Sequence, residues 1–229
     1  MPLNITWLGH SCFSIETGIH RLLVDPFLDD NPAAPMKADA IHADYILVTH
    51  GHFDHVADAA TIAKRTGATV LANYEVSEWI KKQGVAEGKV IGMNPGGAKE
   101  TPFGRMKLTI AHHSSSLPDG SYGGVACGIL LTIAGNRIYF AGDTALFLDM
   151  KLIGMGGLDL AVLPIGDLYT MGPEDSVEAV KFLAPKRVAP CHYNTWPPIE
   201  QDAAAWAANV KRHTAADPVV LQPGESFKL

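Results

Sequence analysis

Histidine and aspartate residues gather in one short stretch of the sequence. The segment Thr49–His55 reads Thr-His-Gly-His-Phe-Asp-His and directly follows the apolar run Tyr45–Val48. It contributes four candidate ligands: His50, His52, Asp54 and His55. Imidazole and carboxylate are the ligand types that borderline divalent metals such as zinc prefer. The stretch therefore predicts a metal site and not merely a polar loop.

The spacing also indicates how the ligands divide. In an extended segment, side chains at positions i and i+2 point the same way, so His50 and His52 can share one metal. Asp54 and His55 belong to the following turn and can face a second metal. Further candidates follow other apolar runs: His112 or His113, then Asp143, then His192. Polar residues at the carboxyl ends of buried strands line a shared crevice in many β/α proteins.

The hydrophobic pattern predicts the elements that position these residues. An antiparallel meander opens the chain at Asn4–Leu8, Cys12–Glu16 and His20–Val24, and the Pro- and Asp-rich segment Phe27–Ala43 is a predicted loop. Later strands are expected at Asp44–Thr49, Ala68–Ala72, Lys89–Met93, Arg105–Ala111, Val125–Ile133, Arg137–Ala141, Leu158–Leu163, Arg187–Pro190, Val219–Leu221 and Ser226–Leu229. Helices are expected at Val56–Thr66, Tyr74–Gln83, Leu146–Met155, Pro173–Leu183 and Ala203–His213.

Antiparallel strands followed by strand–helix units occur twice in this order. The order predicts an α/β (α+β) protein with two packed sheets and helices outside them. We expect one domain over residues 1–229, because a chain of 229 residues can form one sizeable core and no low-complexity linker divides it.

The Thr49–His55 motif resembles the signature of the metallo-β-lactamase superfamily, and the resemblance extends through His113, Ala141–Thr144 and His192 over essentially the whole chain. Within that superfamily the chain is most similar to small metal-dependent hydrolases related to lactonases of the ascorbate-6-phosphate type. The segments that support this are Leu8–Phe13, Leu23–Phe27, Thr170–Pro173 and His192–Pro197. The resemblance implies a four-layer αβ/βα sandwich of two mixed sheets flanked by helices, with a dinuclear site at one edge.

The resemblance also implies a ligand set for two divalent metal ions per chain, with zinc expected and Mn, Ni or Fe as alternatives. The first ion would be held by His50, His52 and His113, and the second by Asp54, His55 and His192, with Asp143 bridging them. His113 is preferred to His112 because the family places Ser directly after this ligand, as Ser114 is here. True β-lactamases of this fold tend to place a thiolate where Asp143 falls, so β-lactam hydrolysis is not expected.

A dinuclear site of this kind predicts a metal-dependent hydrolase. A metal-bound hydroxide would attack a small ester, lactone or phosphoester, and Asp54 would orient the hydroxide or take its proton. His10 is a second catalytic candidate, expected at the rim against substrate or a developing oxyanion. Asp25 is expected behind the ligands, accepting the N–H of a metal-binding histidine. Structural roles for His10 and Asp25 remain open alternatives.

Three other functions are compatible with the motifs. They are a di-iron redox protein on the same scaffold, a phosphodiesterase for small substrates, and a binding module without activity. The net charge of −6 and the lack of a basic run argue against nucleic acid and membrane surfaces as partners. We therefore expect a small-molecule substrate, and a homo-oligomer is compatible with the sequence.

Cysteine usage bears on the compartment. The chain has three cysteines, Cys12, Cys127 and Cys191, and no Cys-x-x-Cys pair, which favours a reducing environment. The N-terminal residues lack the basic and apolar regions of a signal peptide, and no apolar run approaches the roughly 20 residues of a membrane span. These features predict a cytoplasmic protein.

Overall fold

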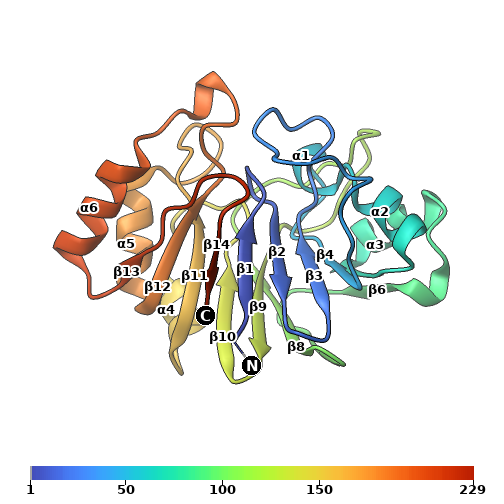
Figure 1. Ribbon diagram of the computed structural model, residues 1–229, viewed down its shortest axis with the longest axis horizontal. Coiled ribbons are helices and arrows are strands. Elements are labelled where there is room, and N and C mark those ends of the chain that lie inside the picture. Colours follow the sequence, from blue (N-terminus) through green and yellow to red (C-terminus); the bar gives the residue numbers. More distant parts are fainter. Residues whose placement is uncertain (1) are drawn as a thin grey trace.

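The computed structural model describes residues 2–229, and it contains two seven-stranded mixed sheets packed face to face (Figure 1). The first sheet has the order β14 (Ser226–Lys228), β1 (Asn4–Trp7), β2 (Phe13–Glu16), β3 (Arg21–Val24), β4 (Tyr45–Leu47), β5 (Thr69–Asn73) and β6 (Val90–Met93). The second has the order β13 (Asp217–Pro218), β12 (Pro185–Cys191), β11 (Leu158–Pro164), β10 (Asn136–Phe140), β9 (Cys127–Ile133), β8 (Gly104–Ile110) and β7 (Ala98–Thr101).

Each sheet passes from antiparallel to parallel pairing. Strands β1 to β3 pair antiparallel and β3 to β6 pair parallel. In the second sheet β7 to β10 pair antiparallel, and β10 to β13 pair parallel. The predicted opening meander and the two-fold repetition of the pattern are confirmed. Parallel pairing sends successive strand ends to the same edge, where connecting loops can carry ligands.

Helices cover the outer faces of both sheets (Figure 1). On one side lie α1 (Phe53–Val56), α2 (Ala59–Thr66) and α3 (Tyr74–Lys82), and on the other lie α4 (Met150–Gly154), α5 (Pro173–Leu183) and α6 (Ala203–His213). Two single-turn 3-10 helices, Glu87–Lys89 and Pro197–Ile199, complete the regular structure. The predicted architecture of two mixed sheets flanked by helices is confirmed. No helix within residues 2–229 has the length and apolar content that crossing a bilayer requires.

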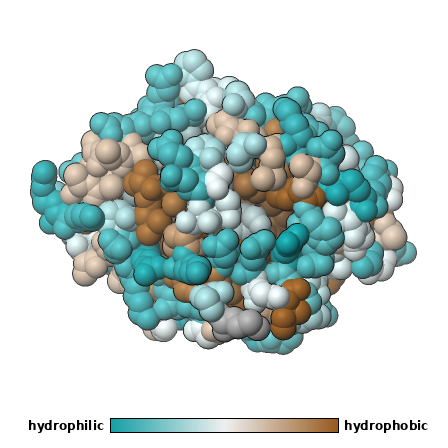
Figure 2. Space-filling model, viewed as in Figure 1, coloured by the Kyte–Doolittle hydropathy of each residue, from teal (hydrophilic) through white to brown (hydrophobic). Residues whose placement is uncertain are grey.

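Alternation along the strands produces the core between the sheets. In β1, Ile5 and Trp7 are buried while Thr6 is half-buried, and Ile5 pairs with Ile15 of β2. These side chains meet those of the second sheet, such as Ile129, in one apolar cluster. Each fully buried aliphatic side chain contributes roughly 1.5–3 kcal/mol. In the view of Figure 2 the outer surface is mostly polar, with apolar residues in small separate patches.

The predicted helix Val56–Thr66 is wrong at its start. The chain forms a short helix α1 through Asp54 and His55, breaks, and then begins α2 at Ala59. The break occurs at Asp58, whose carboxylate accepts the backbone N–H groups of Leu28 (2.6 Å) and Asp29 (3.1 Å). A contact with a loop some 30 residues earlier therefore interrupts a locally helical sequence, and Asp54 lies on a helix instead of a turn.

Three other element predictions need correction. The helix expected over Leu146–Met155 covers only Met150–Gly154, and the preceding residue Ala145 donates its N–H to the carbonyl of His112. The strand expected at Val219–Leu221 lies at Asp217–Pro218, where it pairs with β12. Strand β7 was not predicted, because its residues Ala98–Thr101 are largely exposed and polar and carry no apolar alternation.

Candidate metal centre

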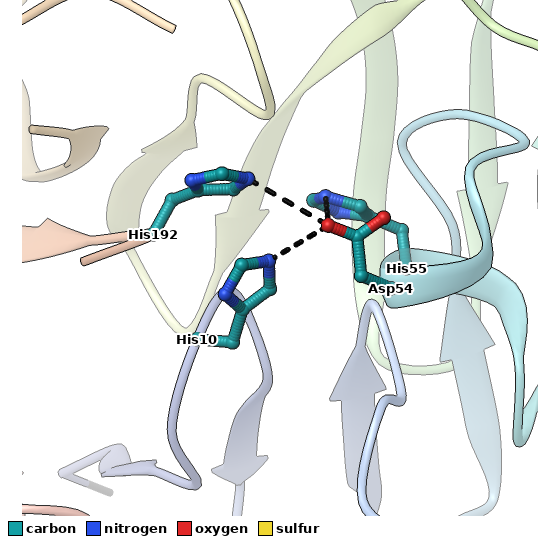
Figure 3. A group of neighbouring side chains, drawn as sticks. All are labelled: His10, Asp54, His55 and His192. Atoms are coloured by element: carbon teal, nitrogen blue, oxygen red, sulfur yellow. Dashed lines mark hydrogen bonds and ion pairs between the residues drawn. The ribbon is translucent and has the colours of Figure 1, made fainter. Parts of the chain in front are cut away.

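The candidate ligands lie at one edge of the molecule, just after the ends of strands. From the first sheet, β4 leads to His50 and His52, and α1 carries Asp54 and His55. From the second sheet, β8, β10 and β12 lead to His113, Asp143 and His192. Figure 3 shows Asp54 and His55 approaching from the helix while His192 and His10 approach from other segments. The site therefore exists only where the two sheets meet.

Three residues near this edge have a left-handed backbone. The φ angles of His10, Asp25 and His192 are 53°, 45° and 54°. Non-glycine residues in this region cost about 1–3 kcal/mol each and persist where the surroundings fix them. Asp25 follows β3 and His192 follows β12 directly, so the turn swings each side chain out of the strand direction and into the site.

One ligand group joins His50, His52 and His113, whose nitrogen atoms lie within 4.8 Å of one another. The Nε2 atom of His50 lies 3.0 Å from Nδ1 of His52. Nitrogen ligands of a tetrahedral zinc ion lie about 3.3 Å apart, so this separation fits a shared ion. His113 faces the group, whereas the exposed His112 packs against Phe147 at a ring distance of 4.9 Å.

A second group joins Asp54, His55 and His192, and it also includes His10 (Figure 3). The Oδ2 atom of Asp54 lies 3.0 Å from Nε2 of His10, 3.8 Å from Nε2 of His192 and 3.9 Å from Nε2 of His55. One carboxylate oxygen thus faces three imidazoles that come from three different segments of the chain.

Asp143 lies between the two groups. Its Oδ2 atom is 3.9 Å from Nε2 of His50 and 3.6 Å from Nε2 of His113, both of the first group. The same oxygen is 3.0 Å from Nε2 of His192 and 3.4 Å from Nε2 of His55, both of the second. A buried carboxylate that reaches both sets has the placement that a bridging ligand requires.

Asp25 fixes histidines of both groups from behind. Its Oδ2 atom accepts Nδ1–H of His55 at 2.9 Å and the hydroxyl of Thr49 at 2.7 Å. Because the Thr49 hydroxyl gives its proton to Asp25, His50 must donate its Nδ1–H to Thr49 Oγ1, which lies 3.0 Å away. Both rings therefore direct Nε2 toward the site, where a metal ion would take the place of its proton. Asp25 lies where the sequence predicted it, accepting the N–H of a proposed metal-binding histidine. The hydrogen bonds of Thr49 to Asp25 and His50 were not predicted.

The predicted rim position of His10 is wrong. The side chain is fully buried, is not part of the cavity lining, and lies beneath Asp54. Its Nε2–H donates to Asp54 Oδ2 at 3.0 Å, and its Nδ1 accepts the hydroxyl of Thr195 at 2.8 Å. Since both ring nitrogens are engaged, His10 positions Asp54 and does not contact substrate. The sequence of the His192–Pro197 segment gave no indication that Thr195 would contact His10.

Burial and charge set the protonation of the site. Burial lowers the pKa of His10 to about 4, with His192 acting in the same direction. Burial likewise lowers the pKa of His50. Burial alone would lower the pKa of His55 too, but Asp143, Asp54 and Asp25 together raise it well above its usual range. Burial opposes ionisation of Asp143, yet His192 and His55 hold its pKa well below the usual range.

The residues fit divalent metal ions. Among the buried polar atoms of residues 2–229 that lack a hydrogen-bond partner are His55 Nε2 and Asp143 Oδ1. Leaving such atoms unpaired is costly, and metal coordination would satisfy them. Five neutral imidazoles and two carboxylates form a donor set suited to Zn, Mn, Ni or Fe.

A cavity of about 700 Å³ opens onto these ligands. His52, Asp54 and His113 form part of its lining. Asp143, His192, Ser114 and Ser116 also line it, and the rest of the wall is aromatic and apolar: Phe53, Leu117, Pro118, Tyr169 and Trp196. Phe53 was not proposed from the sequence. Its place between His52 and Asp54 in the motif is the signal that could have identified it.

Comparison with known proteins agrees with this geometry. A family model for the beta-lactamase superfamily domain matches residues 20–193. The chain belongs to the metallo-β-lactamase superfamily. It is 50% identical over 231 residues to a UPF0173 metal-dependent hydrolase of Symbiobacterium thermophilum, covering 99% of this chain and 100% of the relative. A UPF0173 metal-dependent hydrolase of Thermus thermophilus is 46% identical over 227 residues, with 99% of each chain covered.

A solved structure supports the same placement in the superfamily. Igni18, described as a novel metallo hydrolase of the archaeon Ignicoccus hospitalis, superposes with a TM-score of 0.90 at 34% identity. The match covers 100% of this chain and 99% of Igni18. These relatives place the chain among metal-dependent hydrolases, as the sequence predicted. Their names specify no substrate, so the narrower resemblance to lactonases of the ascorbate-6-phosphate type stays a prediction.

Proposed function

We propose that this chain binds two divalent metal ions and hydrolyses a small ester, lactone or phosphoester. His50, His52 and His113 hold the first ion, Asp54, His55 and His192 hold the second, and Asp143 joins them. One observation carries the proposal: Asp143 Oδ2 lies within 3.9 Å of an imidazole nitrogen from each group. A single-ion site would need no carboxylate in that position.

The chain's own residues divide the work. When bound, the ions supply Lewis acidity and lower the pKa of water toward about 7, so that a nucleophile exists near neutral pH. Asp54 is the more exposed of the two proposed carboxylate ligands, at 13% side-chain exposure against 3% for Asp143. With Oδ2 held by His10, Oδ1 of Asp54 orients the attacking water and accepts its proton.

His55 and His50 contribute orientation. Asp25 and Thr49 hold both rings in the tautomer that presents Nε2, so little reorganisation is needed when the metals bind. The cavity of about 700 Å³ is of the size that takes a small molecule. Zinc is the expected metal, with Mn, Ni or Fe as alternatives, because the donor set suits all four.

Elemental analysis together with a hydrolase screen tests the proposal. We expect close to two metal ions per wild-type chain and turnover of at least one ester, lactone or phosphodiester. Asp143→Ala should lose metal and activity, whereas Asp30→Ala, at an exposed loop aspartate, should keep both. Full metal content and activity in Asp143→Ala would contradict the proposal. A coloured iron protein without hydrolysis would instead favour the redox alternative.

A further inference from the structure

We propose that the non-reacting part of the substrate is uncharged and apolar, so that the site takes neutral esters or lactones with an alkyl or aryl group and excludes phosphorylated or carboxylated ones. The inference deepens the proposed function and depends on it. It rests on the chemistry of the cavity wall away from the metal ligands.

Aromatic side chains dominate that wall. Phe53 and Tyr169 line the cavity yet are 50% and 56% exposed, so their faces are free to contact a ligand. Trp196 lies behind Phe53 at a ring distance of 6.1 Å and also lines the cavity. Leu117 and Pro118 add aliphatic surface from the facing loop. Large apolar side chains exposed around a cavity are a common mark of an apolar ligand site.

Cationic side chains are missing from the segments that line the cavity. Residues 49–63, 111–124, 141–150, 165–172 and 191–202 contain no Lys or Arg. They do contain acidic residues outside the ligand set, among them Asp119, Asp167 and Glu200. Ser114 and Ser116 line the cavity and offer hydroxyl groups without charge. Recognition of a phosphate or carboxylate normally relies on Arg or Lys, and these segments supply neither.

An anionic substituent is therefore disfavoured. Away from the metals, an anionic group would lose its hydration and lie against aromatic ring faces, which carry partial negative charge. No cationic side chain from these segments would pair with it. The bound metals do not compensate, because they would lie among His52, His113 and Asp54 and would be engaged by the reacting group. In the reaction, water oxygen bonds to the acyl carbon, the acyl C–O bond breaks, and a proton of that water ends on the leaving oxygen.

Matched p-nitrophenyl esters test the inference on the metal-loaded protein. The pair is p-nitrophenyl butyrate and mono-p-nitrophenyl succinate, which differ chiefly by a terminal carboxylate. We expect kcat/KM to be at least about tenfold higher for the butyrate, the effect of an unpaired charge in an apolar site. Tyr169→Lys should raise kcat/KM for the succinate and lower it for the butyrate. Tyr74→Lys, at a tyrosine that is 53% exposed and outside the cavity, should leave the ratio unchanged.

A binding measurement on the chelated protein separates this inference from the proposed function, since no turnover is involved. Binding of 4-nitrobenzyl alcohol should quench the fluorescence of Trp196 saturably. The Kd of 4-nitrobenzoate from the same titration should be at least several-fold higher. Trp196→Phe should remove the quenching signal. If esters are hydrolysed but the succinate or a trimethylammonium ester is preferred, the inference is overturned and the proposed function stands. If neutral ligands bind selectively but nothing is hydrolysed, the proposed function fails and the apolar site stands.

Discussion

Asp25 supports two of the proposed ligands from behind. Its carboxylate holds His55 directly and His50 through Thr49, and the proposed function assigns these histidines to different ions. Partners that orient metal-binding histidines typically change metal affinity by about 10–100-fold when they are removed.

We expect Asp25→Asn to weaken both metals. Both oxygens of Asp25 accept hydrogen bonds: Oδ2 from His55 and the Thr49 hydroxyl, and Oδ1 from the Thr49 backbone N–H. Asparagine would turn an amide NH2 group toward one of these sets of donors, so the affinity for each ion should fall by about 10–100-fold. Competition titration with a chromophoric chelator measures this. The matched control is Asp44→Asn. The carboxylate of Asp44 accepts the backbone N–H of Arg21, the first residue of β3, and lies outside the ligand groups. Loss of affinity at only one ion would show that Asp25 does not link the two.

His10 makes the folding stability of the metal-free protein depend on pH. Its folded pKa is about 4, below the 6.5 of an unfolded histidine, so the unfolded chain binds more protons between these values. The stability that the neutral ring contributes is present above pH 6.5 and is lost as the pH falls toward 4, by up to roughly 3 kcal/mol.

Urea unfolding at pH 6.5 and pH 5 in the presence of a chelator measures this effect. We expect His10→Gln to lose less stability than the wild type over that interval, because it removes one group that must be protonated. His42→Gln, at an exposed histidine, should behave like the wild type. Equal losses in all three proteins would mean that His10 is not held neutral.

At the scale of elements, the junction of α1 and α2 connects the ligand helix to the loop Phe27–Ala43. Asp58 holds the start of this loop by two backbone hydrogen bonds. Phe27, beside those bonds, packs against His10 at 5.7 Å and Phe53 at 5.5 Å between ring centroids. The break in the helix thus anchors the residues beneath the cavity.

Asp58→Ala should therefore destabilise the fold by about 1–3 kcal/mol, since it leaves the N–H groups of Leu28 and Asp29 without their acceptor. Amide hydrogen exchange at these two residues should accelerate. Asp58→Asn retains an acceptor oxygen and should lose less, and Asp39→Ala at an exposed aspartate of the same loop should lose nothing measurable. Unchanged exchange in Asp58→Ala would refute the anchoring role.

Local signals explain which elements could be predicted. Helix α5 carries Pro173 at its start and acidic residues in its first turn, and its predicted bounds match the structure. The helix predicted at Val56 was wrong where a distant segment, Pro26–Asp29, makes hydrogen bonds to Asp58. Patterns in sequence report local preference, and these contacts are not local.

Within the site, too, features visible in the local sequence could be predicted and long-range contacts could not. The ligands could be proposed because their types and spacing are visible in the chain, and the structure brings them together. Thr49, Thr195 and Phe53 were missed because their parts depend on which side chains the fold places beside them. The burial of His10 could not be read from its position next to Gly9 and Ser11.

At the scale of the whole molecule, the proposed metal ions would connect the two sheets. The first sheet and α1 carry four of the proposed ligands and the second sheet carries three, so bound ions would add links across the interface that the apolar core already forms. Binding that requires the native arrangement stabilises it by mass action.

Chelation should lower the melting temperature. At metal concentrations a thousand times Kd, bound metal contributes about 4 kcal/mol per site, or roughly 10 °C for a chain of this length. Differential scanning calorimetry at fixed pH, before and after metal is added back, measures the shift. His192→Ala should reduce it, while His213→Ala at an exposed helix end should not. A melting temperature that is indifferent to metal would exclude metal as a link between the sheets.

The shared carboxylate of Asp25 has a consequence for how such a protein can evolve. If the chain holds the two proposed ions, a substitution there disturbs a histidine of each site at once, so natural selection cannot adjust one ion through this position while sparing the other. Changes in metal preference must instead pass through ligands that Asp25 does not hold, such as His52, His113 and His192. The two histidines that depend on Asp25 would thus be inherited as one unit, while the other ligands stay free to vary separately.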